Sequence, residues 1–132
     1  MIAIDTNVLV RFLTQDEPGQ AAAASAFMRG LTSAAPGFIS REVMVELVWV
    51  LERAYRYSRV EVAAALEGLL AAVEIEVEAA DDVGAAVFRY RDDGFGFADL
   101  MIAAAARRAG ATSLVTFDRK AARLPGVDLL PV

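Results

Sequence analysis

Short apolar runs alternate with longer segments that keep helical spacing along the whole chain. The runs predict buried strands at 2–4, 38–39, 114–115 and 127–130, and the alternation of apolar and acidic residues at 73–78 predicts an exposed edge strand. Between the strands, the pattern predicts helices at 21–29, 41–56, 58–72, 81–94 and 97–109. Strands that alternate with helices predict the α/β class, with a central parallel sheet of four to five strands flanked by helices.

Residues at the ends of these segments are typical of helix boundaries. Pro18 predicts the opening of the first helix, and Ser40 is placed to cap the second. Ser58 and Glu61 have the spacing of a capping box, and Asp81 is placed to cap the helix that follows the edge strand. These signals agree with the apolar pattern, so the same order of elements is predicted twice.

The bulk composition fits one domain that spans residues 1–132. The hydrophobic content of 57% is spread over segments shorter than the ~18 apolar residues that span a bilayer, so we expect no membrane association. The first residues lack the basic start and long apolar core of a secretory signal, which predicts a cytoplasmic protein. The net charge of -5 disfavours a surface that attracts nucleic acid everywhere, but it permits a local arginine-lined groove.

The chain contains no histidine and no cysteine, which removes several chemistries at once. Serine–histidine and cysteine–histidine catalysis, histidine-bound zinc, iron–sulfur clusters and disulfides are all excluded. Hydrolytic chemistry would have to use carboxylates, hydroxyls, the single lysine, Lys120, or a metal ion.

Four acidic residues stand near the carboxyl ends of the predicted strands, where ligands bind in parallel sheets. Asp5 follows the first strand and Asp118 follows the fourth, so the two carboxylates lie on one rim if these strands are neighbours. Asp99 is in the first turn of the last helix. Glu46 lies about one and a half turns into the helix after the second strand.

Each acid except Glu46 also has an ordinary structural explanation. Asp5 could cap a short following helix, Asp99 could favour the helix dipole, and Asp118 could cap a turn. Glu46 instead interrupts the apolar run 43–51, which predicts a largely buried helix whose carboxylate faces a polar partner. Four converging carboxylates would repel one another and require a hard cation. The set therefore predicts Mg²⁺, or Mn²⁺, and metal-assisted phosphodiester hydrolysis.

The sequences around these acids resemble the motifs of PIN-domain ribonucleases. The matching stretches are IAIDTNVL at Asp5, VEL at Glu46, FADLMIAA at Asp99 and VTFDRK at Asp118. Their order and spacing extend from residue 1 to about 127, and the small size resembles the VapC toxin branch of the family. The resemblance implies a PIN-like three-layer fold, Mg²⁺-dependent cleavage of RNA, a homodimer, and a partner antitoxin whose C-terminal segment covers the active-site groove.

The resemblance also implies roles for individual residues. Asp5 and Asp99 would be the principal Mg²⁺ ligands, with Glu46 and Asp118 completing the site and positioning water. The supporting residues expected around these ligands are Thr6, Asn7 and Thr116. The candidates for contacts to RNA phosphates are Arg11, Arg41, Arg53 and Arg119, although exposed arginines also solvate helix faces.

Other enzyme classes fit the same acids less well. A haloacid-dehalogenase-type phosphatase also has an aspartate after its first strand, in a nucleophile motif that resembles Asp-x-Asp. Here Asn7 stands where the second aspartate of that motif would be. A receiver-like domain would need an acidic pair, and a nucleotide-binding fold would need a third glycine after Gly94 and Gly96. Two alternatives within the family stay open: a stand-alone RNA-processing nuclease, and a non-catalytic module that binds protein through its apolar helices.

Overall fold

A computed structural model describes residues 1–132 and contains six α-helices, one short 3-10 helix and five strands. The strands are β1 (Ile2–Ala3), β2 (Gly37–Ile39), β3 (Ile75–Val77), β4 (Leu114–Thr116) and β5 (Val127–Leu129). The helices are α1 (Thr6–Thr14), α2 (Pro18–Arg29), α3 (Arg41–Arg53), α4 (Arg59–Ala71), α5 (Ala80–Asp93) and α6 (Phe97–Arg108), with the 3-10 helix η1 (Ala121–Arg123) between β4 and β5. Every predicted strand and helix is present, so the α/β class is confirmed. None of the helices is both long and apolar enough to cross a membrane.

The five strands form two separate parallel sheets. β1, β2 and β3 pair in that order, with Ile2 opposite Gly37, and β4 pairs with β5. The parallel pairing and the edge position of β3 are as predicted, but the five strands are divided into sheets of three and two rather than joined in one central sheet. A common rim for Asp5 and Asp118 required β1 and β4 to be neighbours, and within the chain these strands do not pair.

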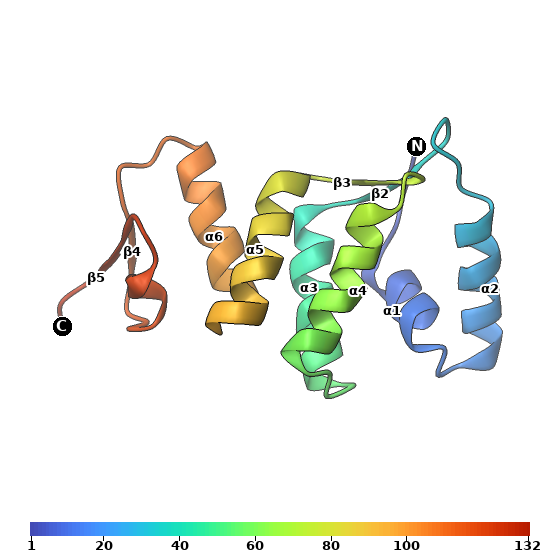
Figure 1. The fold of residues 1–132 in the computed structure, drawn as a ribbon, viewed down its shortest axis with the longest axis horizontal. Coiled ribbons are helices and arrows are strands. Elements are labelled where there is room, and N and C mark those ends of the chain that lie inside the picture. Colours follow the sequence, from blue (N-terminus) through green and yellow to red (C-terminus); the bar gives the residue numbers. More distant parts are fainter.

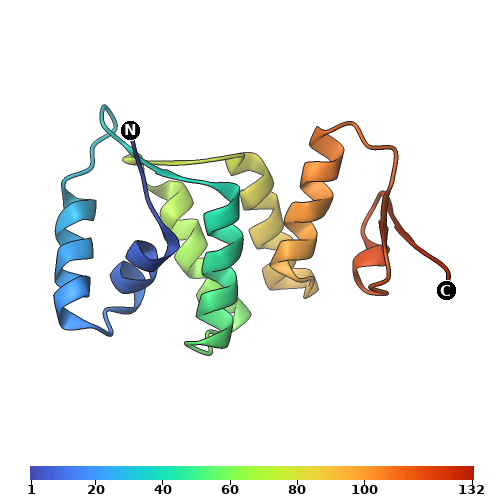
Figure 2. The ribbon, with the colours of Figure 1, turned by 180° about the vertical axis from the view of Figure 1, so that it is seen from behind.

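Helices separate the two sheets along the length of the molecule. In Figures 1 and 2, β1, α1 and α2 lie toward one end, and α3, α4, α5 and α6 occupy the middle. The strands β4 and β5 lie with the C-terminus at the other end, beyond α6. Residues 109–113 connect α6 to β4. The molecule is therefore elongated, and its two sheets do not share an edge.

Most helix starts use the capping residues that the sequence predicts. The Ser40 hydroxyl accepts a hydrogen bond from a backbone N–H in the first turn of α3. Ser58 and Glu61 form the reciprocal bonds of a capping box at the start of α4. Pro18 is the first residue of α2, and the Glu17 carboxylate before it accepts two backbone N–H bonds. These local interactions fix where the helices begin.

Two local expectations are wrong. Asp81 does not cap α5, because Ala79 occupies the cap position with a φ of 52° and Asp81 lies in the first turn. The third helix ends about three residues before the predicted end at Arg56, whose φ of 55° is incompatible with a right-handed helix. In both cases the backbone changes direction at a residue without a glycine or proline signal.

A cluster of 26 buried residues, drawn from segments between Ile4 and Val127, forms the hydrophobic core. Tyr90 is the largest fully buried side chain in it, and its ring meets the Phe97 ring edge-on at 6.2 Å between centroids. The Tyr90 hydroxyl donates a hydrogen bond of 2.6 Å to Glu52. Burial and this carboxylate raise the pKa of Tyr90 well above its ordinary value. The hydroxyl of Tyr90 is therefore a buried polar group that is satisfied by its partner.

Candidate active site

Asp5 lies directly after β1 and caps α1. Its backbone is extended, and its Oδ1 accepts a hydrogen bond of 2.8 Å from the Thr6 N–H. The helix-cap explanation is therefore correct for one carboxylate oxygen. The other oxygen, Oδ2, makes no hydrogen bond within the protein, and the side chain is exposed. Asp5 can cap the helix and still present an oxygen to a ligand.

Asp5 and Glu46 line the same groove, which has a volume of about 320 Å³. We call it the Asp5–Glu46 groove, and its lining residues are Asp5, Thr6, Asn7, Val10, Arg11, Glu46, Val50, Ala54 and Tyr55. Asp5 enters it from the end of β1 and Glu46 from the second turn of α3. Two of the four predicted acids are therefore brought to one cavity by elements that are distant in the sequence.

Glu46 is exposed, which corrects the expectation that it sits within a largely buried helix. The buried face of α3 carries Met44, Leu47, Val48 and Leu51. Glu46 is on the opposite face with Trp49, whose side chain is 58% exposed. The apolar run misled the prediction because an apolar residue on an exposed helix face cannot be distinguished from a core residue by composition alone.

Thr6 is the buried polar residue of the groove. It is 5% exposed, and its Oγ1 is buried with no hydrogen-bond partner. A hydroxyl in this state costs about 1–3 kcal/mol of free energy relative to one that is satisfied. An oxygen ligand without a partner, beside two carboxylates, is what a bound cation or its water shell would satisfy.

Asp99 and Asp118 form the second acidic pair. Asp99 is in the first turn of α6 and is half-buried. Burial and, to a smaller extent, the charge of Asp118 raise the pKa of the Asp99 carboxyl. Gly96, just before α6, leaves room for this side chain, since a Cβ there would lie 3.0 Å from Asp99 Oδ2. Both influences disfavour the charged form of Asp99, and a bound cation would favour it.

Asp118 is exposed and holds the turn after β4. Its backbone N–H donates to the Thr116 hydroxyl at 3.0 Å, and its Oδ1 accepts a hydrogen bond of 2.9 Å from the Ala121 N–H at the start of η1. The turn-cap explanation is correct here too, and Thr116 orients Asp118 through its backbone. As with Asp5, one carboxylate oxygen is used locally while the other is available.

The four acids therefore form two pairs. Asp5 and Glu46 lie in one groove, and Asp118 is near enough to Asp99 for its charge to raise the pKa of the Asp99 carboxyl. No three acidic side chains come close enough together in one chain to hold a metal ion. The physical reason is the division of the sheet, which leaves β1 and β4 apart.

The donor set nevertheless fits a hard divalent cation. All the candidate ligands are oxygen atoms, which select Mg²⁺ or Mn²⁺ over softer metals. The unpartnered Thr6 hydroxyl and the raised pKa of Asp99 both indicate positions where a cation would relieve an unfavourable arrangement. Each pair alone supplies two carboxylates, and the two pairs together supply four.

The four candidate arginines differ in how many contacts within the protein hold their side chains in place. Arg41 donates to the Met101 carbonyl at 2.8 Å and pairs with Asp82 at 3.3 Å. Arg53 lies over the Trp49 ring at 5.9 Å, and Arg119 is exposed. These contacts hold the half-buried Arg41 against its own chain, whereas Arg119 is exposed and can meet a ligand.

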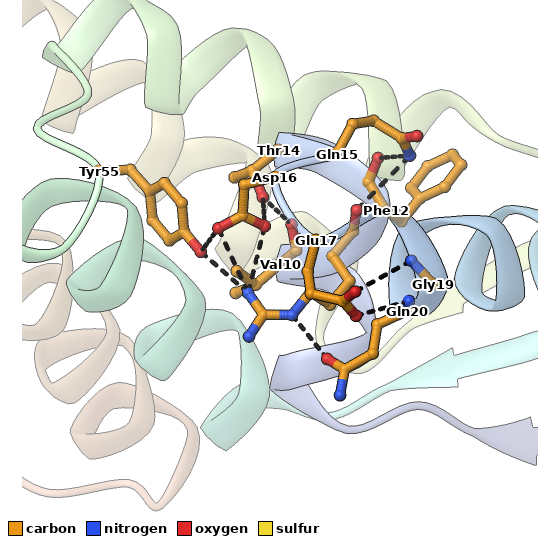
Figure 3. Close-up of polar contacts among 10 residues, drawn as sticks. Val10, Phe12, Thr14, Gln15, Asp16, Glu17, Gly19, Gln20 and Tyr55 are labelled. Carbon is orange, nitrogen blue, oxygen red and sulfur yellow. Dashed lines mark hydrogen bonds and ion pairs between the residues drawn. The ribbon is translucent and has the colours of Figure 1, made fainter.

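Arg11 belongs to a polar network at the edge of the Asp5–Glu46 groove that the sequence did not reveal. Its Nη1 donates to the Tyr55 hydroxyl at 3.0 Å and to Asp16 at 3.2 Å, while its Nε donates to Gln20 at 2.7 Å. The Tyr55 hydroxyl donates to Asp16 at 2.6 Å, and Figure 3 shows the two side chains pointing toward one another. This hydrogen bond, more than the charge of Arg11, lowers the pKa of Asp16. Asp16 and Tyr55 are 39 residues apart, so no local pattern signals the contact.

Two comparisons with known proteins cover nearly the whole chain. The model of the PIN domain family matches residues 2–127, a span that includes all four acids. A protein of Aquifex aeolicus (strain VF5) that carries the name VapC ribonuclease is 27% identical over 124 residues. The aligned region covers 94% of this chain and 92% of that protein. The likeness therefore concerns the full domain rather than one motif.

Proposed function

Since the chain belongs to the PIN domain family, we propose that it is a metal-dependent endoribonuclease that hydrolyses RNA phosphodiester bonds. The observation that carries the proposal is the placement of the acids: Asp5 follows β1, Asp118 follows β4, and each is paired with a second carboxylate. A set of oxygen ligands without histidine or cysteine suits phosphodiester hydrolysis assisted by Mg²⁺ or Mn²⁺.

A bound Mg²⁺ or Mn²⁺ would supply an activated water and neutralise charge on the phosphate. Asp5 and Asp99 are the proposed principal ligands, and Glu46 and Asp118 complete the set and orient the attacking water. Thr6 and Asn7 line the same groove; the Thr6 hydroxyl is buried, and Asn7 is exposed. Thr116 holds the backbone of Asp118. The capping bonds of Asp5 and Asp118 fix the direction of both carboxylates before substrate binds.

Phosphate contacts are proposed for arginines at the rim of the site. Arg11 lines the Asp5–Glu46 groove, and its Nη2 makes no hydrogen bond within the protein. Arg119 adjoins Asp118 and is exposed. Two guanidinium groups beside the acids would attract an RNA backbone locally, in a protein whose net charge of -5 repels nucleic acid elsewhere.

We further propose that the protein is the toxin of a toxin–antitoxin pair in the cytoplasm, forms a homodimer, and is inhibited by an antitoxin that covers the groove. The likeness to the VapC ribonuclease of Aquifex aeolicus supports this role. Expression of the chain alone should arrest growth, and co-expression of a small neighbouring gene should relieve the arrest. Harmless expression of a protein that cleaves RNA in vitro would favour a stand-alone RNA-processing nuclease instead.

The activity is tested with purified protein and a structured RNA. We expect cleavage with Mg²⁺ or Mn²⁺, none in EDTA, and recovery when Mg²⁺ is restored. Asp5→Asn should abolish cleavage, and Glu46→Gln should reduce it strongly. Glu42→Gln, one turn earlier on α3, is the matched control and should cleave as the wild type does. Undiminished cleavage in EDTA would refute the metal mechanism, and a folded protein that cleaves no RNA would favour the non-catalytic module.

A further inference from the structure

β1 and β4 each have an unpaired edge. β1 is the first strand of the three-stranded sheet, and the N–H groups of Ile2 and of Ile4, just after β1, donate to the carbonyls of Pro36, just before β2, and of Phe38, within β2. In a parallel ladder, alternate residues face opposite sides, so the N–H and C=O of Ala3 face the open edge. Such an edge is a template for another strand.

β4 has the same property on its own sheet. The Leu114 N–H donates to the Gly126 carbonyl, and the Thr116 carbonyl accepts from the Leu130 N–H. Both residues therefore face β5, and the N–H and C=O of Val115 face outward. Each open edge thus presents one residue with a free donor and a free acceptor, and both edges belong to parallel sheets. The two edges are complementary.

Apolar surface accompanies both edges. Val115 is 59% exposed and Phe117 is 66% exposed beside β4, and Ile2 is 56% exposed on β1. A groove of about 680 Å³ lies beside β1 and is lined mainly by apolar residues of β1, α1 and α2. The total accessible surface is 7560 Å². A compact protein of 14.1 kDa exposes roughly 6,700 Å². The excess is surface that a partner would cover.

The chain does not bring its own two edges together. The helices α3, α5 and α6 stand between β1 and β4 (Figures 1 and 2). The segment that carries β4 and β5 is also anchored, because Leu124 and Val127 are part of the buried core, and Leu124 and Pro125 border α5 and α6. Pairing within one chain would break these contacts. Pairing with a second copy would keep them.

We propose that two copies of this chain exchange their C-terminal strands, β4 of each copy pairing with β1 of the other. Each half of the dimer then contains a continuous parallel sheet in the order β3-β2-β1-β4-β5, with β4 and β5 from the partner. Residues 109–113, where Gly110 has a φ of 77°, are the connection that holds the C-terminal strands away from their own chain. Both open edges are satisfied at once, which gives a closed dimer.

The exchange completes the acidic site, and this part of the inference rests on the proposed nuclease function. If Val115 lies opposite Ile2, then Asp118 lies level with Asp5, because Asp118 is three residues after Val115 and Asp5 is three residues after Ile2. Asp5 and Glu46 of one copy would then meet the Asp99 and Asp118 pair of the other. Neither chain has more than two of these acids together by itself.

The strand pairing is tested by engineered cysteines, since the chain has none of its own. Ile2→Cys and Val115→Cys are made as separate single variants, refolded together and oxidised. We expect a disulfide-linked dimer that contains one chain of each variant. We also expect the wild-type protein in solution to have twice the 14.1 kDa mass of one chain. Val60→Cys on α4, a position as exposed as these two, replaces Val115→Cys in the control mixture and should give no such product.

Three results would overturn the exchange. The first is a doubly substituted Ile2→Cys, Val115→Cys chain that closes its disulfide within a monomer. The second is monomeric wild-type protein whose mixed single variants form no link. The third is an open-ended assembly that grows with concentration, since it would show that the two edges do not pair reciprocally.

The composite site is tested by complementation. Asp5→Asn and Asp118→Asn variants with different tags are co-expressed, and each alone should be inactive. In a mixed dimer one site carries both substitutions and the other carries neither. Cleavage should therefore return to about a quarter of the wild-type level at random mixing. If the disulfide-linked dimers form but the wild type cleaves no RNA, the nuclease function alone is refuted. If the wild type cleaves RNA but the mixed variants do not recover activity, the composite site alone is refuted.

Discussion

The negative charge of Asp118, in the turn after β4, lies close enough to Asp99, in the first turn of α6, to raise the pKa of the Asp99 carboxyl. Burial is the larger cause of the raised pKa of Asp99, and the negative charge of Asp118 is the second. The pair joins the start of α6 to the turn after β4, which are otherwise separated by the whole of the last helix. Two like charges held together in this way store an unfavourable interaction that a cation can relieve.

Asp118→Asn should therefore lower the pKa of Asp99 without returning it to the ordinary value. The substitution removes the charge of Asp118 but leaves the burial of Asp99, and the asparagine oxygen can still accept the Ala121 N–H bond. A carboxyl-carbon NMR titration of the metal-free protein measures the change. Glu76→Gln, on the exposed side of β3, is the control and should leave the Asp99 titration unmoved. An unchanged pKa in Asp118→Asn would mean that the two side chains are not neighbours in solution.

Asp82 connects three helices through two arginines. It lies in the first turn of α5 and forms ion pairs with Arg41 of α3, at 3.3 Å, and with Arg108 of α6. The hydrogen bond from Arg108 is the largest influence on the pKa of Asp82, which is lowered. We expect Asp82→Asn to reduce the free energy of unfolding by about 1 kcal/mol near neutral pH.

The loss should depend on pH with a defined sign. Because the folded-state pKa of Asp82 lies below the ordinary value of 3.8, the carboxylate stabilises the fold above that value, and the effect disappears as pH falls through the folded pKa. Urea unfolding across acidic pH should show the curves of Asp82→Asn and wild type converging in strong acid. Asp81→Asn, its exposed neighbour, should follow the wild type closely. A constant difference at all pH values would contradict the ion-pair explanation.

The secondary structure could be predicted because it depends on short-range signals. The spacing of apolar residues, together with proline and capping residues, located the strands and five helices, and the Ser58 capping box forms as expected. The errors arose where the backbone turns at residues without such signals, as at Ala79 and Arg56. Glu46 was misplaced for a different reason, because Val45 and Trp49 are apolar residues on an exposed helix face.

The arrangement of the candidate acids could not be predicted from the motifs that contain them. Whether Asp5 and Asp118 share a rim depends on which strands pair, and strand order is set by contacts between distant segments. The same limit applies to Arg41, whose partner Asp82 is 41 residues away. Sequence patterns describe each element, whereas the neighbours of an element follow from the packing of the whole chain.

Arg59 holds the loop that leads into the helix carrying Asp99. Its Nη1 donates to the carbonyls of Tyr90 and Phe95 at 2.8 Å each, and its guanidinium lies over the Tyr90 ring at 4.4 Å. Arg59→Met keeps the apolar stem but removes both bonds, so it should cost about 2 kcal/mol of unfolding free energy. Because Phe95 is four residues before Asp99, we also expect a lower kcat for RNA cleavage with little change in KM.

Arg89→Met provides the comparison for Arg59→Met. Arg89 also lies over the Phe95 ring, at 4.9 Å, but it pairs only with Asp93 on the surface of α5. Its loss should cost less than about 0.5 kcal/mol. Equal effects of the two substitutions on unfolding and on kcat would show that the loop does not depend on the carbonyl bonds.

The buried hydroxyl of Thr6 should oppose stability and favour function. Since Thr6 Oγ1 has no partner, Thr6→Val should raise the free energy of unfolding in EDTA by about 1 kcal/mol, yet weaken Mg²⁺ binding and cleavage several-fold. Urea unfolding with and without Mg²⁺ separates the two effects. Thr14→Val at the other end of α1 should instead destabilise, because the Thr14 hydroxyl donates to the Val10 carbonyl at 2.7 Å. Destabilisation by Thr6→Val in EDTA would mean that the hydroxyl already has a partner without metal.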